Sequence, residues 1–186
     1  MFDICVDVFA QLDLPININK CHCIRIGPRF KYPCSEIQIL KQKINWVDSI
    51  EYLGIVINRA KQFECSWKRA RCNFFKSANT ILGRLGTKIA IDVTLKLIYN
   101  QSLPSLLYGT AAATITKTDL KDFQKAYDSV FAKLFSSYDK NILLQCQYFS
   151  EYWSLDIVYD FNRLNFLKKL TKAGKLSNKL EIDCID

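Results

Sequence analysis

The spacing of apolar residues changes once along this chain, near residue 60, and the change limits the folds open to it. Before that point, short apolar segments separated by turn residues have the pattern of β-strands. From residue 63 onward, apolar residues recur every three or four positions, as on an amphipathic helix. We therefore expect an α+β fold in which a small antiparallel sheet with one helix precedes an all-helical bundle.

The first part, residues 1–58, is predicted to contain one helix and several strands. Apolar residues at helical spacing predict a helix that ends before Pro15. In the last strand, Tyr52, Leu53 and Gly54 interrupt the alternation of apolar residues, and we interpret Gly54 as a bulge or bend within one strand. The segments predicted to be strands are 18–27, 36–40, 44–47 and 50–57.

The first predicted helix of the second part covers residues 62–86. Phe63, Trp67 and Phe74 begin its apolar stripe, and the stripe continues at helical spacing toward Gly86. A helix with this pattern is expected to pack its apolar side inward and expose the rest.

Further helices are predicted to follow. The second is interrupted at Pro104 and ends at Gly109, and the third has Thr118 and Asp119 as candidate N-caps. A last amphipathic helix, with Phe161 and Leu164 among its apolar residues, is expected to stop at Gly174. The predicted domains are thus a helical one over 59–150 and a C-terminal helix with a tail over 151–186.

The positive charge of the chain is concentrated in one segment. The net charge is +8, and residues 59–88 hold eight basic side chains against the single acidic residue Glu64. Elsewhere acidic and basic residues nearly balance. A basic helix is often only a solvated surface, but an excess confined to one element also indicates nucleic-acid binding. The candidate contact residues are Lys61, Lys68, Arg69, Arg71, Lys76 and Arg84.

Neither a metal site nor a catalytic constellation is evident. The eight cysteines form no Cys-x-x-Cys pair, and on a strand Cys21 and Cys23 would face away from His22, so we expect buried reduced thiols. Asp3 and Asp7 lie one helical turn apart, but no third ligand accompanies them. No Gly-rich loop precedes a helix to bind phosphate.

Membrane insertion and secretion are not expected. The chain has no run of 18 apolar residues, and its first residues include acidic side chains where a signal peptide has basic ones. We expect an intracellular protein of the nucleus or cytoplasm. No compact cluster of basic residues marks a nuclear signal.

Four spaced elements follow one another along the chain: LPININKCHCIRIGPRF, INWVDSIEYLGIVI, the basic helix and LPSLLYG. In this order they resemble the C-terminal part of a reverse transcriptase of non-LTR (LINE-type) retrotransposons. The resemblance covers residues 1–150 or more. It implies the end of a palm domain over 1–58, followed by a helical thumb.

The resemblance also implies roles for individual residues. The segment 17–20 resembles the palm motif that follows the catalytic strand, with Lys20 near the phosphates of the incoming nucleotide. Tyr52, Leu53 and Gly54 resemble the primer grip, where a bend at Gly54 would direct main chain toward the primer backbone. The basic residues of the thumb-like helix would contact the RNA and DNA of a primer–template hybrid.

The catalytic centre of that family is missing from this sequence. Such polymerases hold two metal ions, normally magnesium, with an early aspartate and an Asp-Asp pair that follows an aromatic residue. Neither occurs here, and the Asp-Asp hairpin would end just before Met1. We therefore expect a fragment without catalytic residues or a cofactor of its own, which binds primer–template without polymerising. The missing N-terminal polymerase portion is a further candidate partner.

Two alternatives remain open at this point. The chain fits a non-enzymatic helical module that binds nucleic acid or protein. It also fits a relic open reading frame with no selected function. Genomic sequence upstream of Met1 that encodes an aromatic-x-Asp-Asp motif would favour a decayed element.

Overall fold

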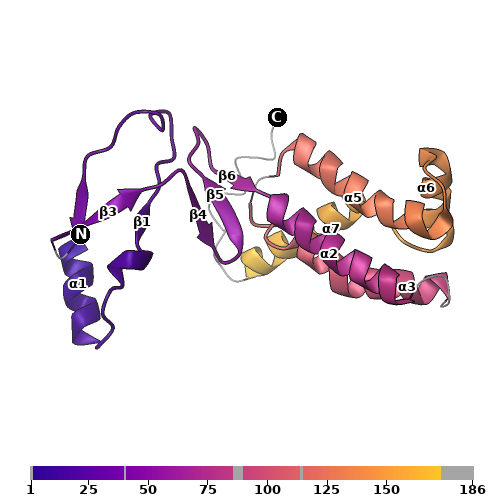
Figure 1. Cartoon of the computed structure of the whole chain (residues 1–186), viewed down its shortest axis with the longest axis horizontal. Helices are drawn as coiled ribbons and strands as arrows, with labels where there is room; N and C mark the ends of the chain where they lie inside the picture. The colour runs from indigo at the N-terminus through magenta and orange to yellow at the C-terminus, as the bar shows by residue number, and fades with distance from the viewer. Residues whose placement is uncertain (1, 40, 86–89, 114, 173–186) are drawn as a thin grey trace. The chain divides into compact units, whose positions relative to one another are not determined.

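A computed structural model describes residues 2–39, 41–85, 90–113 and 115–172 of the chain (Figure 1). The chain divides into two compact units, residues 1–66 (unit 1) and 67–186 (unit 2). Unit 1 contains all the described strands, and the described elements of unit 2 are all helical, so the predicted α+β class is confirmed. The boundary between the units follows residue 66 and not the predicted residue 58, because the strand at 64–66 pairs with the strand before it in unit 1.

The described strands of unit 1 form two three-stranded sheets rather than one. The first has the order β1 (His22–Cys23), β3 (Gln42–Trp46), β2 (Ile37–Ile39). Here β2 is antiparallel to β3, as expected, but β1 runs parallel to it. The second sheet is antiparallel throughout, with the order β4 (Ser49–Tyr52), β5 (Ile55–Asn58), β6 (Glu64–Ser66).

The prediction of one bent strand over 50–57 is wrong. Tyr52 pairs with Ile55, so Leu53 and Gly54 form a two-residue turn between β4 and β5. Both have positive φ, 48° at Leu53 and 78° at Gly54, as the central residues of a type I′ hairpin turn require. The change of phase in the apolar pattern therefore marks the reversal of the chain, which glycine permits because it has no Cβ.

The predicted strand over 18–27 is mostly absent. Ile18–Lys20 is a short 3-10 helix, η1, and only β1 remains of the strand. The loop that follows β1 is held by arginine side chains instead of strand pairing. Arg25 donates to the carbonyl oxygens of Tyr32 (3.2 Å) and Pro33 (3.3 Å), and Arg59 donates to the carbonyl of Phe30.

Helix α1 (Phe2–Gln11) forms as predicted, but its apolar residues are exposed. Ile4 and Val8 remain 67% and 48% accessible. The helical spacing of these residues thus defines a stripe that the described part of unit 1 does not cover.

Helix α2 (Lys68–Leu85) begins later than the predicted residue 62. Cys65 pairs with Ile57 as part of β6, and Phe63 is 52% exposed, so the first residue assigned to the apolar stripe is not helical. The rest of the stripe is confirmed, since Phe74 and Ala78 are fully buried in unit 2. The predicted end at Gly86 lies outside the described residues.

The predicted interruption near Pro104 is confirmed and takes the form of a wider helix. α3 (Ile91–Leu97) leads into a π-helical segment, η3 (Ile98–Ser102), and then into α4 (Leu103–Leu107). Pro104 has no N–H to donate, and its ring would crowd the carbonyl four residues earlier, so the backbone widens just before it. α4 ends before Gly109, as predicted.

The remaining helices in the described part of unit 2 are α5 (Lys117–Phe135), α6 (Lys140–Phe149) and α7 (Leu155–Lys172). α2 packs against α3, η3, α4 and α5, and α5 packs against α6 and α7 (Figure 1). α7 therefore belongs to the bundle rather than to a separate C-terminal part. The largest fully buried apolar side chains of the described residues lie here: Phe74, Ile98, Leu106, Phe123, Phe131 and Leu155.

Two details of these helices differ from prediction. The N-cap of α5 is Thr116, which accepts a hydrogen bond from the Asp119 N–H (3.1 Å), so neither predicted candidate occupies the cap position. On α7, Phe161 and Leu164 are 64% and 54% exposed rather than packed inward. The predicted stop at Gly174 lies outside the described residues.

No helix within the described ranges combines the length and apolar character needed to cross a bilayer.

Candidate nucleic-acid interface

The outward side of α2 carries basic side chains and no acidic ones. Because α2 turns by about 100° per residue, Lys76 lies roughly opposite the buried Phe74. Lys68, Lys76 and Arg84 are exposed, as is Arg69, which also interacts with another residue. We call these four residues, Lys68, Arg69, Lys76 and Arg84, the basic face of α2.

Arg71, predicted as a fifth contact residue of this helix, does not belong to that face. Its guanidinium donates to Asp122 on α5 at 2.7 Å, with both side chains about two-thirds buried. Asp122 also accepts from Lys125 at 3.3 Å. That hydrogen bond, together with the charges of Lys125 and Arg71, lowers the pKa of the Asp122 carboxyl. Arg71 therefore fastens α2 to α5.

The remaining predicted site residues belong to unit 1. Lys61 is exposed in the connection between β5 and β6, and Lys20 is exposed at the end of η1. Tyr52 and Leu53, at the tip of the β4–β5 hairpin, are 63% and 69% exposed. Among the predicted site residues, therefore, only the basic residues of α2 share one helix. Lys20, Lys61 and the hairpin tip are separate exposed positions of unit 1.

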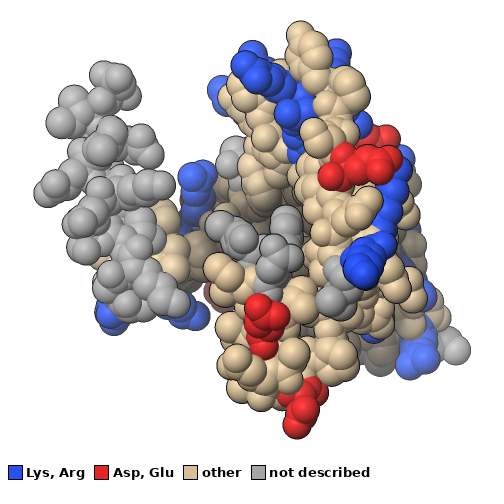
Figure 2. Space-filling view, turned by 90° about the vertical axis from the view of Figure 1, so that its left-hand side faces the viewer, with Lys and Arg blue, Asp and Glu red and all other residues tan. Residues whose placement is uncertain are grey.

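Exposed basic side chains also occur away from α2, for example Lys117 and Lys121 on α5 and Lys168 on α7. On the face drawn in Figure 2, Lys and Arg side chains occur in several separate places, with Asp and Glu side chains among them. The concentration of charge on α2 is therefore the feature of the described chain that best suits a polyanion.

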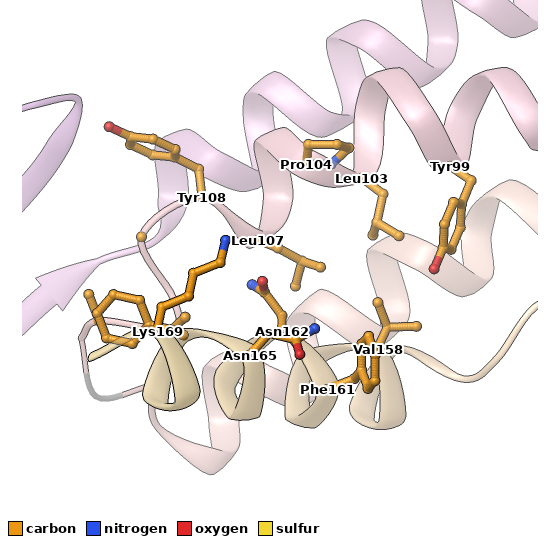
Figure 3. Close-up of a pocket in the computed structure, with 14 residues that line it drawn as sticks. Tyr99, Leu103, Pro104, Leu107, Tyr108, Val158, Phe161, Asn162, Asn165 and Lys169 are labelled. Atoms are coloured by element: carbon orange, nitrogen blue, oxygen red, sulfur yellow. The ribbon is translucent and has the colours of Figure 1, made fainter. Parts of the chain in front are cut away.

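A second polar feature of unit 2 is a cavity of about 540 Å³ between α4 and α7. Figure 3 shows the side chains of Asn162, Asn165 and Lys169 extending from α7 toward Leu107 of α4. They are spaced three and four residues apart, so they share one side of α7. The sequence pattern does not distinguish these residues as a site, because polar residues at this spacing usually mark a solvated helix face.

Those three side chains have no hydrogen bond or ion pair with another described residue. Apolar groups, including Leu103 and Phe161, form other parts of the wall. The cavity therefore offers an ammonium and two amides to a ligand with an anionic or amide-like group. Five residues of the motif LPSLLYG line it: Leu103, Pro104, Leu107, Tyr108 and Gly109.

Metal ligands and reactive thiols do not converge in the part of the chain that the structure describes. No group of three or more His, Cys, Asp or Glu residues there is placed to hold a metal ion. The described cysteines are free, as expected, but only Cys65 is buried, while Cys5 and Cys72 are exposed. Burial raises the pKa of the Cys65 thiol, which disfavours the reactive thiolate. The side chain of Asp3 lies outside the described residues.

No protein-family model matches this chain, and no curated protein or solved structure is significantly similar to it.

Proposed function

We propose that the chain is an intracellular, C-terminal fragment of a non-LTR retrotransposon reverse transcriptase that binds primer–template nucleic acid without polymerising. The observation that carries the proposal is the basic face of α2, which has no acidic residue on the same helix. The order of motifs in the sequence supports the family, and the exposed hairpin tip at Tyr52 and Leu53 suits the contact expected of a primer grip.

The basic face suits backbone contacts rather than recognition of a base sequence. Lysine and arginine neutralise phosphates and release condensed counterions, so affinity falls as salt rises. Reading a base requires side chains placed at base edges in a groove. The exposed neutral residues of α2 are Cys72, Asn73, Phe75, Asn79, Thr80 and Gly83. Few of them can bond a base edge, and Asn79 already accepts from Lys133. Binding should therefore be weak and largely independent of sequence.

A salt titration with a fluorescein-labelled RNA–DNA primer–template tests this function. With about four phosphate contacts, the logarithm of the affinity should fall against the logarithm of the salt concentration with a slope of about −3 to −4. Changing Lys68, Lys76 and Arg84 together to glutamine should reduce the steepness of that slope by roughly three. Fluorescence anisotropy at several salt concentrations measures both values.

The matched control changes Lys117, Lys121 and Lys168 to glutamine, which removes the same charge from exposed positions on α5 and α7. This variant should keep a slope close to that of the unmodified chain. Lys125 and Lys133 are unsuitable as controls, because they contact Asp122 and Asn79. A flat slope for the unmodified chain, or equal losses in the two variants, would refute binding through α2.

With nucleotides and magnesium added, the primer should remain unextended, and steady extension would contradict the absence of catalytic carboxylates.

A further inference from the structure

A cavity of about 480 Å³ lies at the connection between α6 and α7. The aromatic residues Tyr148, Tyr152 and Trp153 form much of its wall. Gln147 and Glu151 supply polar groups. All five come from one short stretch of sequence, and none of them belongs to the basic face of α2 or to the cavity beside α4.

The aromatic rings of this cavity are unusually open to solvent. Tyr148 is 79% exposed and Trp153 is 64% exposed, and the neighbouring Phe149 is 79% exposed. Large exposed rings that lie together are typical of an interaction surface. The face of an aromatic ring also attracts cations, most strongly for tryptophan.

The charge of the cavity favours a cation. Glu151 is the only Asp, Glu, Lys or Arg among the described residues that line it. Its carboxylate is exposed and makes no hydrogen bond or ion pair with a described residue. A negative, aromatic cavity on a chain with net charge +8 would repel phosphate and attract a positive group.

Gln147 adds an unfilled acceptor. Its side chain is 2% exposed, and its Nε2 donates to Asp128 at 2.9 Å. Its oxygen Oε1 is buried without a hydrogen-bond partner among the described residues. The amide cannot be turned over, because Oε1 would then face the Asp128 carboxylate. Gln147 lines the cavity, and an N–H donor bound there would satisfy this acceptor.

The frame around the cavity is held by further hydrogen bonds. Asp128 also accepts from Gln124 Nε2 at 2.7 Å, and Gln124 Oε1 accepts from the N–H of Leu155 at 3.1 Å. The hydroxyl of Tyr127 donates to the carbonyl of Trp153 at 3.3 Å. These contacts fix the connection between α6 and α7 on α5, so the site is largely preformed.

We propose that this cavity binds the guanidinium group of an arginine in a partner polypeptide. A guanidinium stacks on aromatic rings, pairs with a carboxylate through two parallel hydrogen bonds, and has further N–H groups to donate. Tyr148 and Trp153 supply the rings, Glu151 the carboxylate and Gln147 the additional acceptor. A lysine ammonium has no plane to stack and fewer donors, so it satisfies this set less completely.

Titration of the full chain with blocked Gly-Arg-Gly peptide, followed by NMR, tests the site. The chain has three tryptophans, Trp46, Trp67 and Trp153, so the indole N–H signal of Trp153 can be assigned with a Trp153→Phe variant. That signal should shift saturably. The isosteric but neutral Gly-citrulline-Gly peptide should bind about fivefold more weakly or worse, and Gly-Lys-Gly should bind more weakly than the arginine peptide.

Two charge variants test whether the Glu151 carboxylate contacts the arginine. Glu151→Gln should weaken binding of the arginine peptide by about threefold or more. Asp160→Asn is the control, because Asp160 is an exposed acid of α7 that does not line the cavity. Absence of a saturable Trp153 shift, equal binding of the citrulline peptide, or equal effects of the two variants would overturn the proposal. Equal binding of the lysine peptide would overturn the assignment to arginine. None of these outcomes depends on nucleic-acid binding by α2.

Discussion

At the scale of single residues, glycine has opposite effects on stability at two positions, because the backbone conformation differs between them. Gly54 has a φ of 78°, which a residue with a Cβ adopts only at a cost. Gly83 is an ordinary helical residue on the exposed side of α2, and a Cβ added there would meet no atom within 4 Å. Gly54 is therefore required by its turn, whereas Gly83 only weakens its helix.

Replacement of Gly83 by alanine should stabilise unit 2. Alanine lowers the conformational entropy of the unfolded chain and favours helix, so the free energy of unfolding should rise by about 0.5–1 kcal/mol. Chemical denaturation monitored by circular dichroism measures the change. Gly54→Ala should instead destabilise unit 1 by about 1–2 kcal/mol. A loss of stability in Gly83→Ala would show that the outward side of α2 is more crowded than the structure indicates.

The lowered pKa of Asp122 predicts a specific sensitivity to acid. Its hydrogen bond from Lys125 and its pairing with Arg71 stabilise the charged carboxylate only in the folded chain. This contribution is present above the unfolded pKa of about 3.9 and is lost as the pH falls through the lower folded pKa. The difference in stability between the unmodified chain and Asp122→Asn should therefore shrink as the pH falls below about 4. A difference that stays constant over this pH range would contradict the pairing.

At the scale of elements, local side-chain chemistry decides where helices begin. Thr116 caps α5 by accepting from the Asp119 N–H, and its own hydroxyl donates to the Asp119 carboxylate at 2.6 Å. This reciprocal pair is a capping box with aspartate in place of glutamate. Thr118, two residues later, is exposed inside the first turn and caps nothing in the described structure.

Substitution of Thr116 by alanine should lower the free energy of unfolding of unit 2 by about 1 kcal/mol, the usual cost of losing an N-cap. Thr118→Ala serves as the matched control and should change stability little, since the hydroxyl it removes makes no cap. Thermal and chemical denaturation of the two variants provide the comparison. If Thr118→Ala proved the more harmful, α5 would begin later than the structure places it.

At the scale of the whole molecule, the two units differ in how much apolar surface they bury. Among the described residues, unit 1 buries the apolar side chains of Ile39, Ile44, Ala60 and Cys65, whereas unit 2 buries three phenylalanines completely along with other large side chains. Buried apolar area is the main source of folding free energy. Unit 2 should therefore be the more stable part of the chain.

Native-state hydrogen exchange should separate the units. Amide protons of α5, which packs against three other helices, should be the most protected. Amides of β1, β2 and β3 should exchange at least about tenfold faster, because their small sheet covers few buried side chains. Mass spectrometry after timed exposure to deuterated water measures both sets. Equal protection in β3 and α5 would show that the units unfold together.

The sequence by itself determined the class of the fold and most of the helices. The 3.6-residue spacing of Phe74, Ala78 and their neighbours predicted the buried side of α2, and Pro104 marked the change of helix geometry, because both signals act over one or two turns of backbone. The excess of charge on α2 was equally a property of the sequence.

Only the tertiary structure decided features that depend on residues far apart in the chain. The pairing of Ile57 with Cys65 made a strand where periodicity predicted helix, and the ion pair between Arg71 and Asp122 joins α2 to α5. Likewise, the exposure of Tyr148 followed from which side of α6 packs on α5. Hydrophobic pattern specifies that a side chain prefers burial, but which surfaces actually meet depends on long-range packing that neighbouring residues in sequence do not encode.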